Sequence, residues 1–600
     1  MCGIVGYVGC KNAVDVVFDG LKTLEYRGYD SAGIAISNGK IEVYKTSGRV
    51  VDLKGKLEGL DCRTAIGHTR WATHGAPTTL NAHPHLSFDG KIAVVHNGII
   101  ENCTALKSIL TAKGIRFVSD TDSEIIAHLL ACEVCETPVA CDASEVCVDG
   151  GVGKICGTCK TCEVFLHTVE KVANMIEGAT TFLAIREGDE KVYCSRRGAS
   201  LTIGLGEDEN FVTSDTLAIC DKTSTVLPLK DGDVAVIGAN SVEVYHGGQK
   251  VQRETSKLNR TRPKESDCYM RTEIDEIPLA VSRTIDRFFA ERDKQAEEKL
   301  KNAKKLFFVG CGTAFHACLY AKHVFKKLLG VNADAVCSSE FDAGDVDDGT
   351  VAVFISQSGE TADTVLAAEE CKKRGGFTIA ICNVEGSLLS FTAHNVFYTE
   401  AGAEVAVAAT KSFVCQLALI YVLAKSIKGE VLGANFKTDF VKALASATAL
   451  PALELPNKDK KLFFIGKGTD VVTAKEAALK VKEITCKMTD AYPAGELKHG
   501  PIALIDETCL AVVIATSRKD FGRIEATTQE LKSRGAIVYA VSSIGDFGAD
   551  KTLNLPTPPD ELLMPAVAII PLERLALDTS LRLGLNPDKP RNLAKSVTVI

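Results

Sequence analysis

The second residue of the chain, Cys2, places a thiol where it can become the N-terminus. Met1 is normally removed before a small residue, which would leave Cys2 with a free α-amine. That amine has an ordinary pKa of about 7.7–8.0 and can act as general base for the thiol. Because most cysteines at this position are incidental, Cys2 alone leaves both interpretations open.

Polar residues beside glycines could complete a site around that thiol. A buried amide substrate needs a cation for its carboxylate, a carboxylate for its amine and donors for the oxyanion. Arg70, Asp122, and Asn97 with the Gly98 N–H have these properties. Asp122 could equally be a helix N-cap. The sequence thus predicts a site for an amide substrate and leaves a structural role for Asp122 open.

A serine-rich turn, Ser356–Thr361, follows an apolar strand pattern and precedes a helical one. Hydroxyls and backbone N–H groups at a helix N-terminus bind phosphate well. The ligand should lie outside the carboxyl ends of the strands. A Ser/Gly turn before a helix is, however, often only a cap.

Further candidates lie near the C-terminus. Lys480 and Glu483 are spaced i, i+3 and share one face of a predicted helix. By themselves they could be a surface ion pair. The tail 591–600 contains Lys595 and could be a frayed terminus.

The elements around these residues predict two kinds of domain. Short β patterns, two hairpin signals and intervening helical segments before residue 245 predict an α+β layered domain. The polar, weakly periodic residues after it predict a linker. We expect the boundaries 2–246 for the first domain and 247–289 for the linker.

An internal repeat organises the rest of the chain. The segment 304–313 matches 460–469 at an offset of 156, and both copies alternate strands with helices. This predicts two doubly wound α/β domains with parallel sheets, at 290–450 and 451–600. The second copy, Ala515–Lys519, lacks the Ser-Gln-Ser-Gly turn, so only the first is equipped for phosphate.

Composition narrows the class of protein. The 600 residues carry 69 Lys+Arg against 77 Asp+Glu, a net charge of −8, without a long basic block, which argues against nucleic-acid binding. No apolar run approaches the ~18–20 residues that span a bilayer. The 22 cysteines lie mostly in apolar segments, which favours a reducing, cytoplasmic location.

Seven of the cysteines crowd into residues 132–162. Their C-x₂-C spacing is compatible with a structural zinc site, and redox sensing or a plain loop insertion are the alternatives. The candidate ligands are Cys132, Cys135, Cys156, Cys159 and Cys162.

Several motifs together resemble a known family. The segments 1–7, 25–33, 68–75 and 96–98 are similar to class II glutamine amidotransferase domains, and the two repeats to sugar isomerase domains. The combination resembles the isomerising glutamine–fructose-6-phosphate aminotransferases over nearly the whole chain, apart from an insertion at about 132–163. This resemblance implies an N-terminal-nucleophile fold for the first domain.

The resemblance also implies an activity. L-glutamine would give its amide nitrogen to D-fructose 6-phosphate, yielding D-glucosamine 6-phosphate and glutamate, the first step of the hexosamine pathway. No cofactor would be required, and the chain would form a homo-oligomer, a dimer or tetramer. Alternatives are another ketose phosphate acceptor, a glucosamine-6-phosphate deaminase-like reaction, or a non-catalytic phosphosugar sensor.

Site roles follow from the same resemblance. Lys595 would form a Schiff base with the ketose, Glu483 would move a proton between C1 and C2, His499 would assist ring opening, and Lys480 would support proton transfer. Trp71 would gate the passage of ammonia. The implied catalytic residues are Cys2, Asn97, Gly98, Lys480, Glu483, His499 and Lys595, and the implied substrate-binding residues are Arg27, Arg70, Trp71, Thr73, His74, Asp122, Thr313, Ser356, Gln357, Ser358, Thr361, Val407 and Ala594.

Three residues depart from the family pattern. Ala314 and Ala409 each stand where the family has serine, and the chain ends in Ile600 rather than glutamate. Each lost hydroxyl removes a hydrogen bond that typically contributes about 0.5–1.5 kcal/mol. We therefore expect these changes to affect how tightly the substrate binds rather than which substrate is used.

The cysteine cluster generates a testable prediction. If residues 132–162 bind zinc, elemental analysis of the purified protein should find near-stoichiometric metal. Replacing Cys156, Cys159 and Cys162 by serine should then remove it. Protein that is metal-free as isolated would favour the plain insertion.

Overall fold

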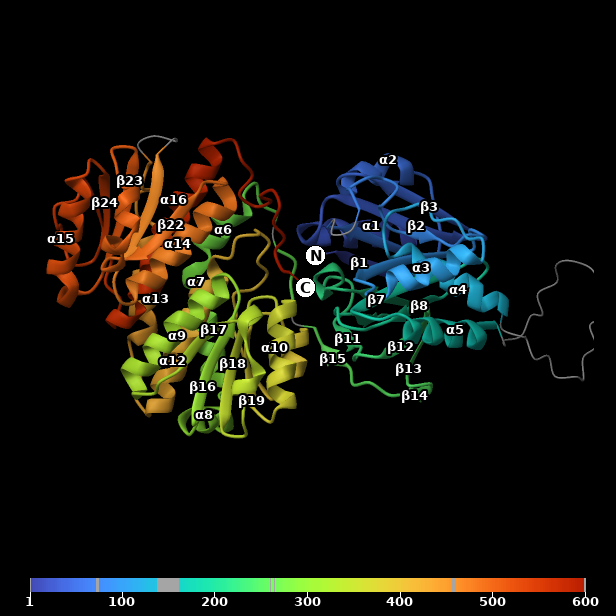
Figure 1. Cartoon of the computed structure of the whole chain (residues 1–600). Helices are drawn as coiled ribbons and strands as arrows, with labels where there is room; N and C mark the ends of the chain where they lie inside the picture. The colour runs from blue at the N-terminus through green and yellow to red at the C-terminus, as the bar shows by residue number, and fades with distance from the viewer. Residues whose placement is uncertain are drawn as a thin grey trace, which may run out of the picture. The chain divides into compact units, whose positions relative to one another are not determined.

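The computed structural model describes residues 2–71, 75–136, 161–258, 260–263, 265–455 and 460–597, without the side chains of residues 135, 136 and 161–163. The chain divides into two compact units, Met1–Arg262 and Pro263–Thr598 (Figure 1).

The N-terminal unit contains two antiparallel sheets packed face to face. Residues such as Ile4 and Ile66 from one sheet share a core with Val95 and Leu183 from the other. The eight-stranded sheet has the order β15 (Ser256–Lys257), β11 (Thr225–Pro228), β9 (Thr202–Leu205), β10 (Glu209–Thr213), β1 (Gly3–Gly9), β4 (Thr64–Arg70), β2 (Ser31–Asn38), β3 (Lys40–Thr46). The seven-stranded sheet has the order β14 (Gln249–Val251), β13 (Ser241–His246), β12 (Asp233–Gly238), β8 (Val192–Ser195), β7 (Thr180–Arg186), β6 (Ile92–Gly98), β5 (His85–Leu86).

Helices cover the outer faces of both sheets. Helix α1 (Ala13–Leu24) packs on β1 and β4, and Asn12 caps it by accepting from the Val14 N–H at 3.1 Å. Helices α3 (Cys103–Ala112), α4 (Glu124–Glu136) and α5 (Thr161–Met175) share a core with the second sheet. Since β1 is buried along its whole length, its sequence is almost continuously apolar rather than alternating. The unit is the α+β layered fold that the sequence predicts.

The C-terminal unit contains two parallel five-stranded sheets, as the repeat predicts. Both have the strand order 2-1-3-4-5 of a doubly wound fold. The first is β17 (Asp334–Cys337), β16 (Lys305–Gly310), β18 (Thr350–Ser356), β19 (Phe377–Cys382), β20 (Asn395–Tyr398); the second is β22 (Thr489–Pro493), β21 (Lys461–Gly466), β23 (Cys509–Ala515), β24 (Ile537–Ser542), β25 (Lys551–Asn554).

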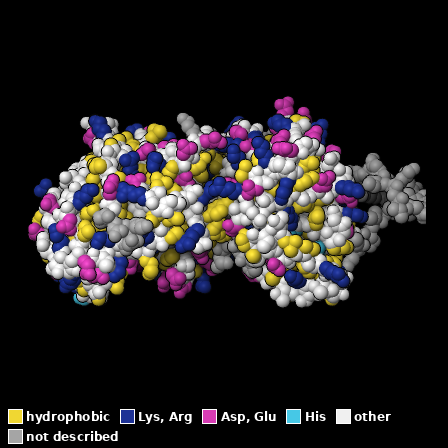
Figure 2. All heavy atoms as spheres, turned by 90° about the horizontal axis from the view of Figure 1, so that it is seen from above, with side chains coloured by type: hydrophobic (Ala, Val, Ile, Leu, Met, Phe, Trp, Pro, Cys, Tyr) yellow, Lys and Arg dark blue, Asp and Glu magenta, His cyan; other side chains and the backbone are white. Residues whose placement is uncertain are grey.

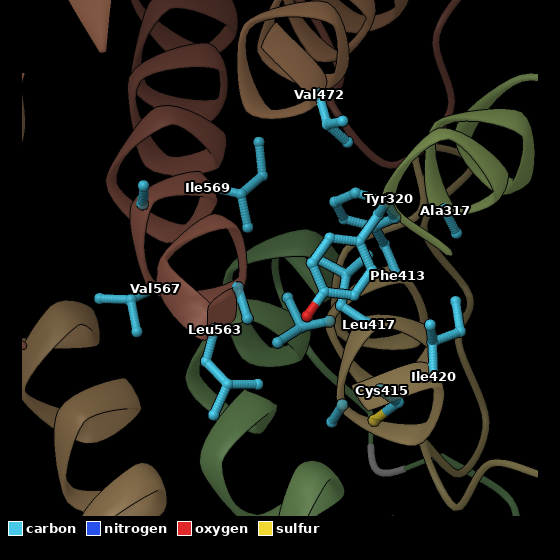
Figure 3. Close-up of a cluster of buried hydrophobic side chains, with 14 of the residues drawn as sticks. Ala317, Tyr320, Phe413, Cys415, Leu417, Ile420, Val472, Leu563, Val567 and Ile569 are labelled. Atoms are coloured by element: carbon cyan, nitrogen blue, oxygen red, sulfur yellow. The ribbon is translucent and has the colours of Figure 1, made fainter. Parts of the chain in front are cut away.

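Helices from both repeats share one core. Tyr320, Phe413, Val472 and Ile569 belong to the same buried cluster and approach one another in Figure 3. Helix α12 is buried on nearly all sides, which explains its unusually apolar sequence. The contributing helices are α9 (Thr313–Leu329), α12 (Lys411–Lys428), α13 (Phe436–Thr448), α14 (Asp470–Thr485) and α16 (Met564–Arg582), while α10 (Ala362–Lys373) and α15 (Phe521–Lys532) lie against the strands.

The predicted linker, 247–289, differs from the structure. Strands β14 and β15 extend the sheets of the N-terminal unit as far as Lys257. Helices α6 (Tyr269–Asp275) and α7 (Ile277–Ala290) contribute buried residues to the C-terminal core. The prediction was wrong here because edge strands and amphipathic helices can be polar enough to resemble a linker. A further helix, α8 (Lys294–Lys301), precedes β16.

Charged residues are mixed on the surface. In the face shown in Figure 2, Lys and Arg side chains alternate with Asp and Glu side chains. Within the described part of the chain, no helix combines the length and apolarity needed to cross a bilayer.

Candidate functional site

The Cys2 thiol lies against the backbone of Trp71. Its Sγ is 3.7 Å from the Trp71 carbonyl oxygen and 3.3 Å from the Trp71 nitrogen. Antiparallel pairing of β1 with β4, with Gly3 opposite Thr69, brings together residues that are 69 positions apart. The thiol therefore lies where strand β4 ends.

An amide and a glycine backbone lie beside the nucleophile. The Asn97 Nδ2 donates to the Cys2 carbonyl oxygen at 3.3 Å, and its Oδ1 is 3.1 Å from the His68 Nε2. Burial lowers the pKa of His68 to about 3, so its ring is neutral. Gly98 has φ +137°, and a Cβ there would lie 1.7 Å from the Ala179 carbonyl oxygen, so a side chain does not fit. The Asn97 side chain thus places an amide donor beside Cys2, and Gly98 follows it at the end of β6.

A cation and a carboxylate complete this group. Arg70 is only 4% exposed. Burial lowers its pKa, while the charges of Cys2, Asp30 and Asp122 oppose that effect, which places all three within electrostatic reach. The Asp122 Oδ2 accepts the Ile100 N–H at 2.8 Å. This combination of a thiol, a guanidinium and a carboxylate suits an α-amino acid substrate.

Arg27 and Trp71, which were also predicted for this site, contact other side chains of the unit. Arg27 is buried and pairs with Asp215, with its NH1 3.1 Å from the carboxylate. The Trp71 ring meets the Tyr29 ring edge-on, with centroids 5.5 Å apart. Thr73 and His74 lie outside the described residues.

The serine-rich turn joins β18 to α10. The Ser356 Oγ lies 3.2 Å from the Thr361 Oγ1 and accepts the Gly359 N–H at 3.0 Å. Gly359 has φ +66°, and a Cβ there would lie 2.0 Å from the Ser387 Oγ. Gln357 is half-buried in the same turn. The hydroxyls thus meet at the end of a parallel strand, where an α/β fold binds its ligands.

The C-terminal tail folds onto this turn. The Ser596 Oγ lies 2.9 Å from the Ser358 Oγ, and the Ala362 N–H donates to the Val597 carbonyl oxygen at 3.0 Å. Ala594 is half-buried just before Lys595. Through residue 597, the tail is docked rather than frayed.

Docking buries Lys595 against Glu404. The Nζ is 2.6 Å from the Glu404 Oε2, and the side chains are 4% and 0% exposed. Burial disfavours ionisation of Glu404, but Lys595 and hydrogen bonds from Thr410 and Ser412 lower its pKa to about 2. Val407, in the same segment, donates its N–H to the Asp588 carbonyl oxygen at 3.1 Å.

Lys480 is the centre of a second buried network. It is 0% exposed, and its Nζ lies 2.7 Å from Glu483, 3.2 Å from Glu476 and 3.0 Å from the Thr313 Oγ1. The His316 Nδ1 lies 2.6 Å from the Glu476 Oε2. Burial raises the pKa of Glu483, and Lys480 partly offsets this. The alternative of a surface ion pair is therefore wrong.

Several acidic groups were missed from the sequence. Glu476 could have been found, because Glu476, Lys480 and Glu483 follow an i, i+4, i+7 pattern on one helix face. Glu404 has no such signal, since it meets Lys595 only when the tail docks. Glu573 is fully buried on α16, and its carboxyl oxygens have no hydrogen-bond partner among the described residues. Burial raises its pKa well above the ordinary value.

His499 makes no described contact with these groups. His499 is exposed on the 3-10 helix η6 (Glu496–His499), and no hydrogen bond or ion pair described for the structure involves its ring. Cys132 is buried on α4, whereas the side chains of Cys135, Cys156, Cys159 and Cys162 lie outside the described residues. In the described ranges no group of three or more His, Cys, Asp or Glu side chains is arranged to hold a metal ion.

Comparison with known proteins places the chain in a class. The glutamine amidotransferase domain model matches residues 45–137, and the SIS domain model matches 299–426 and 456–579. A solved structure, the C-terminal domain of glucosamine-fructose-6-phosphate aminotransferase from Francisella tularensis, is 30% identical, with a TM-score of 0.48, and covers 54% of this chain and 99% of its own. The chain combines a glutamine amidotransferase domain with two SIS domains.

Full-length relatives identify the family. The glutamine–fructose-6-phosphate aminotransferase (isomerizing) of Fusobacterium nucleatum is 37% identical, and that of Methanosarcina acetivorans 38% identical, each over 100% of both chains. The chain belongs to the family of isomerizing glutamine–fructose-6-phosphate aminotransferases.

Glu273 generates a prediction about pH. It is 3% exposed, accepts the Ala406 N–H at 3.3 Å, and burial together with the Glu404 charge raises its pKa to about 8. Between its unfolded pKa and about 8 the folded state holds the additional proton, so this group's contribution to stability falls as pH rises. We expect Glu273→Gln to flatten the decline in the melting temperature from pH 5 to pH 8.

The control is Glu298→Gln, which changes an exposed carboxylate on α8. It should leave the slope of melting temperature against pH unchanged. A Glu273→Gln protein with the original slope would show that Glu273 is ionised in the folded state.

Proposed function

We propose that this chain transfers the amide nitrogen of L-glutamine to D-fructose 6-phosphate with isomerisation, giving D-glucosamine 6-phosphate and L-glutamate. The observation that carries the proposal is the match over the whole length to relatives named for this reaction. The two buried groups of side chains supply the chemical functions that it requires.

In the first half-reaction, the Cys2 thiol attacks the glutamine amide. The α-amine of a processed N-terminus accepts the thiol proton, and ammonia leaves from the tetrahedral intermediate. Arg70 holds the substrate carboxylate, and Asp122 holds the substrate amine. Asn97 and the Gly98 N–H donate to the oxyanion, a type of contact whose loss typically costs ~2.7–4 kcal/mol in the barrier. Water then releases glutamate from the thioester.

In the second half-reaction, the Lys595 amine attacks the ketose carbonyl and forms a Schiff base with loss of water. The ammonium must first release a proton to solvent, and Glu404, 2.6 Å away, holds the side chain in place. Ammonia displaces the lysine, and Glu483 moves a proton between C1 and C2. Its raised pKa makes the Glu483 carboxylate a stronger base than that of an exposed glutamate, which favours this proton transfer.

The substrate phosphate is assigned to the turn that contains Ser356, Gln357, Ser358 and Thr361. Thr313 begins α9, which follows β16, the neighbour of β18 in the sheet, and its Oγ1 contacts the Lys480 Nζ. His499 remains a proposed ring-opening residue and Trp71 a proposed gate for ammonia. We further propose a cytoplasmic homo-oligomer that uses no cofactor, nucleic acid or membrane.

Two assays separate this proposal from its alternatives. Glutaminase activity with and without fructose 6-phosphate distinguishes a synthase from a phosphosugar sensor, which would hydrolyse nothing. Identification of the amino sugar distinguishes fructose 6-phosphate from another acceptor.

Replacement of Cys2 tests the first half-reaction. Cys2→Ala removes the nucleophile, so glutamine-dependent synthesis should fall by at least about three orders of magnitude. Fructose 6-phosphate binding, measured by calorimetry, should be unchanged because its residues belong to another unit. Normal glutamine turnover in Cys2→Ala, or in protein that retains Met1, would contradict the assignment.

Replacement of Lys595 tests the second half-reaction. Borohydride should trap a covalent adduct of fructose 6-phosphate on Lys595 in the unaltered protein, and mass spectrometry should locate it. Lys595→Arg should abolish the adduct while keeping a cation beside Glu404. Lys595→Ala should also abolish it, but should destabilise the unit by about 3–5 kcal/mol because Glu404 is left buried and unpaired.

Glutaminase activity is the control for both variants, since Cys2 is unaffected. An adduct that persists in Lys595→Arg and maps to another lysine would exclude Lys595 as the nucleophile.

A further inference from the structure

A large cavity lies in the N-terminal unit, apart from the Cys2 group. Its volume is about 1120 Å³, at the upper end of what small-molecule sites use. It is lined by strand β3, the β5–β6 hairpin and the connection from α3 to α4. Cys2, Arg70, Asn97 and Asp122 are not among its lining residues. The cavity is therefore distinct from the proposed glutamine site.

The wall of this cavity is partly apolar and solvent-accessible. Leu86 is 37% exposed, Phe88 49% and Val118 66%, and Tyr44 and Ile115 lie beside them. A group of accessible large apolar side chains around a hollow is uncommon on a soluble protein surface and typically marks a binding site. These side chains would cover the apolar body of a ligand.

The charge of the lining is positive. Lys45, Lys56 and Arg116 line the cavity, and among the described residues no carboxylate lies within ion-pair distance of any of them. Burial lowers the pKa of Lys45 to about 8 and the Glu124 charge partly opposes this, so the ammonium is mostly charged at neutral pH and a bound anion would stabilise that charge. The protein as a whole is acidic, so this local excess of cations is not a reflection of composition.

The acidic residue of the lining, Glu124, acts electrostatically on Lys45 but is otherwise held by its own neighbours. Glu124 is buried and accepts hydrogen bonds from the Val118 and Ser119 N–H groups at 2.9 and 2.7 Å and from the Ser119 Oγ at 2.6 Å. The His128 Nε2 lies 3.2 Å from it, and the His128 Nδ1 is buried without a hydrogen-bond partner. The carboxylate is occupied by its neighbours, and one ring nitrogen of the lining remains available.

We propose that this cavity binds a small organic anion with an apolar body, and that binding alters the glutamine site. An apolar wall with unpaired cations is complementary to a molecule that carries a carboxylate, sulfonate or phosphate on a hydrophobic group. This function goes beyond the transfer reaction, since neither substrate has that character.

One loop connects the cavity to the glutamine site. Ser119 and Glu124 line the cavity, and Asp122 lies between them in the sequence. The Ser119 Oγ is 3.0 Å from the Thr121 Oγ1, which is also 3.0 Å from the Nε2 of His85, another lining residue. A ligand that displaces Ser119 or His85 would therefore move the backbone that carries Asp122.

A stack of histidines makes a second connection. The rings of His85 and His83 have centroids 4.7 Å apart, and those of His83 and His68 lie 4.0 Å apart. His68 in turn contacts the Asn97 side chain at 3.1 Å. Burial holds the pKa of all three histidines well below the ordinary value, so the three rings are neutral; His83 stacks on His68 and meets His85 edge-on.

The binding test uses 8-anilinonaphthalene-1-sulfonate, an anion with an aromatic body whose emission rises in apolar sites. The full-length protein should bind it saturably, and the uncharged analogue N-phenyl-1-naphthylamine should bind at least tenfold more weakly. The double variant Lys56→Glu/Arg116→Glu should weaken sulfonate binding at least tenfold. The matched control Lys54→Glu, an exposed lysine near Lys56 that does not line the cavity, should not.

The coupling test measures glutamine hydrolysis. A saturating concentration of the sulfonate should change the KM for glutamine at least twofold in the unaltered protein and in Lys54→Glu. The double variant should retain the basal activity and lose the response. Equal sulfonate affinity in the double variant would overturn the site, and an unchanged KM at saturation would overturn the coupling. Fluorescence titration needs no enzymatic activity, so these outcomes are distinguishable from failure of the proposed transfer reaction.

Discussion

The burial of Lys595 against Glu404 is the interaction on which the C-terminal site depends. A lysine at the fifth position of the tail 591–600 has no reason to be ordered by itself. Here its Nζ pairs with the carboxylate of Glu404, which is buried and accepts hydrogen bonds from Thr410 and Ser412. Removing either charge would leave the other desolvated, at a typical cost of about 3–5 kcal/mol. The pair thus fixes the tail, and the tail in turn brings Ser596 to Ser358.

The two repeats differ in the side chains at the turn that follows β18 in the first copy and β23 in the second. In the first, Ser356 and Thr361 leave a ring of hydroxyls at the end of β18. In the second, the buried carboxyl of Asp470 accepts the Thr516 N–H at 2.9 Å and lies 2.5 Å from its hydroxyl. Burial raises the pKa of Asp470 to about 7 although Thr516 stabilises its charged form. An internal carboxyl therefore stands in one copy where the other presents hydroxyls, so the duplicated fold has one candidate phosphate site.

In the N-terminal unit, strand pairing is what brings the residues of the site together. Its thiol must lie beside donors and a cation, yet Cys2, Arg70 and Asn97 are far apart in the chain. The end of β4 next to the start of β1 brings Arg70 and Trp71 to the thiol, and β6 of the opposing sheet brings Asn97. Because strands are rigid along their length, residues at strand ends can be positioned closely without loops of fixed conformation.

The sequence by itself determined the layered N-terminal fold, the duplicated doubly wound fold and the motifs at Cys2, the serine turn and Lys480, because these are local patterns of periodicity and spacing. It misplaced the linker, since strands β14 and β15 and helices α6 and α7 carry too weak a pattern to be recognised. Only the tertiary structure decided that Lys480 is buried, that Glu404 is the partner of Lys595, and that burial raises the pKa of Glu273 and Glu573. Their burial and charge partners come from segments distant in sequence, and neither desolvation nor a contact over 191 positions leaves a local signal.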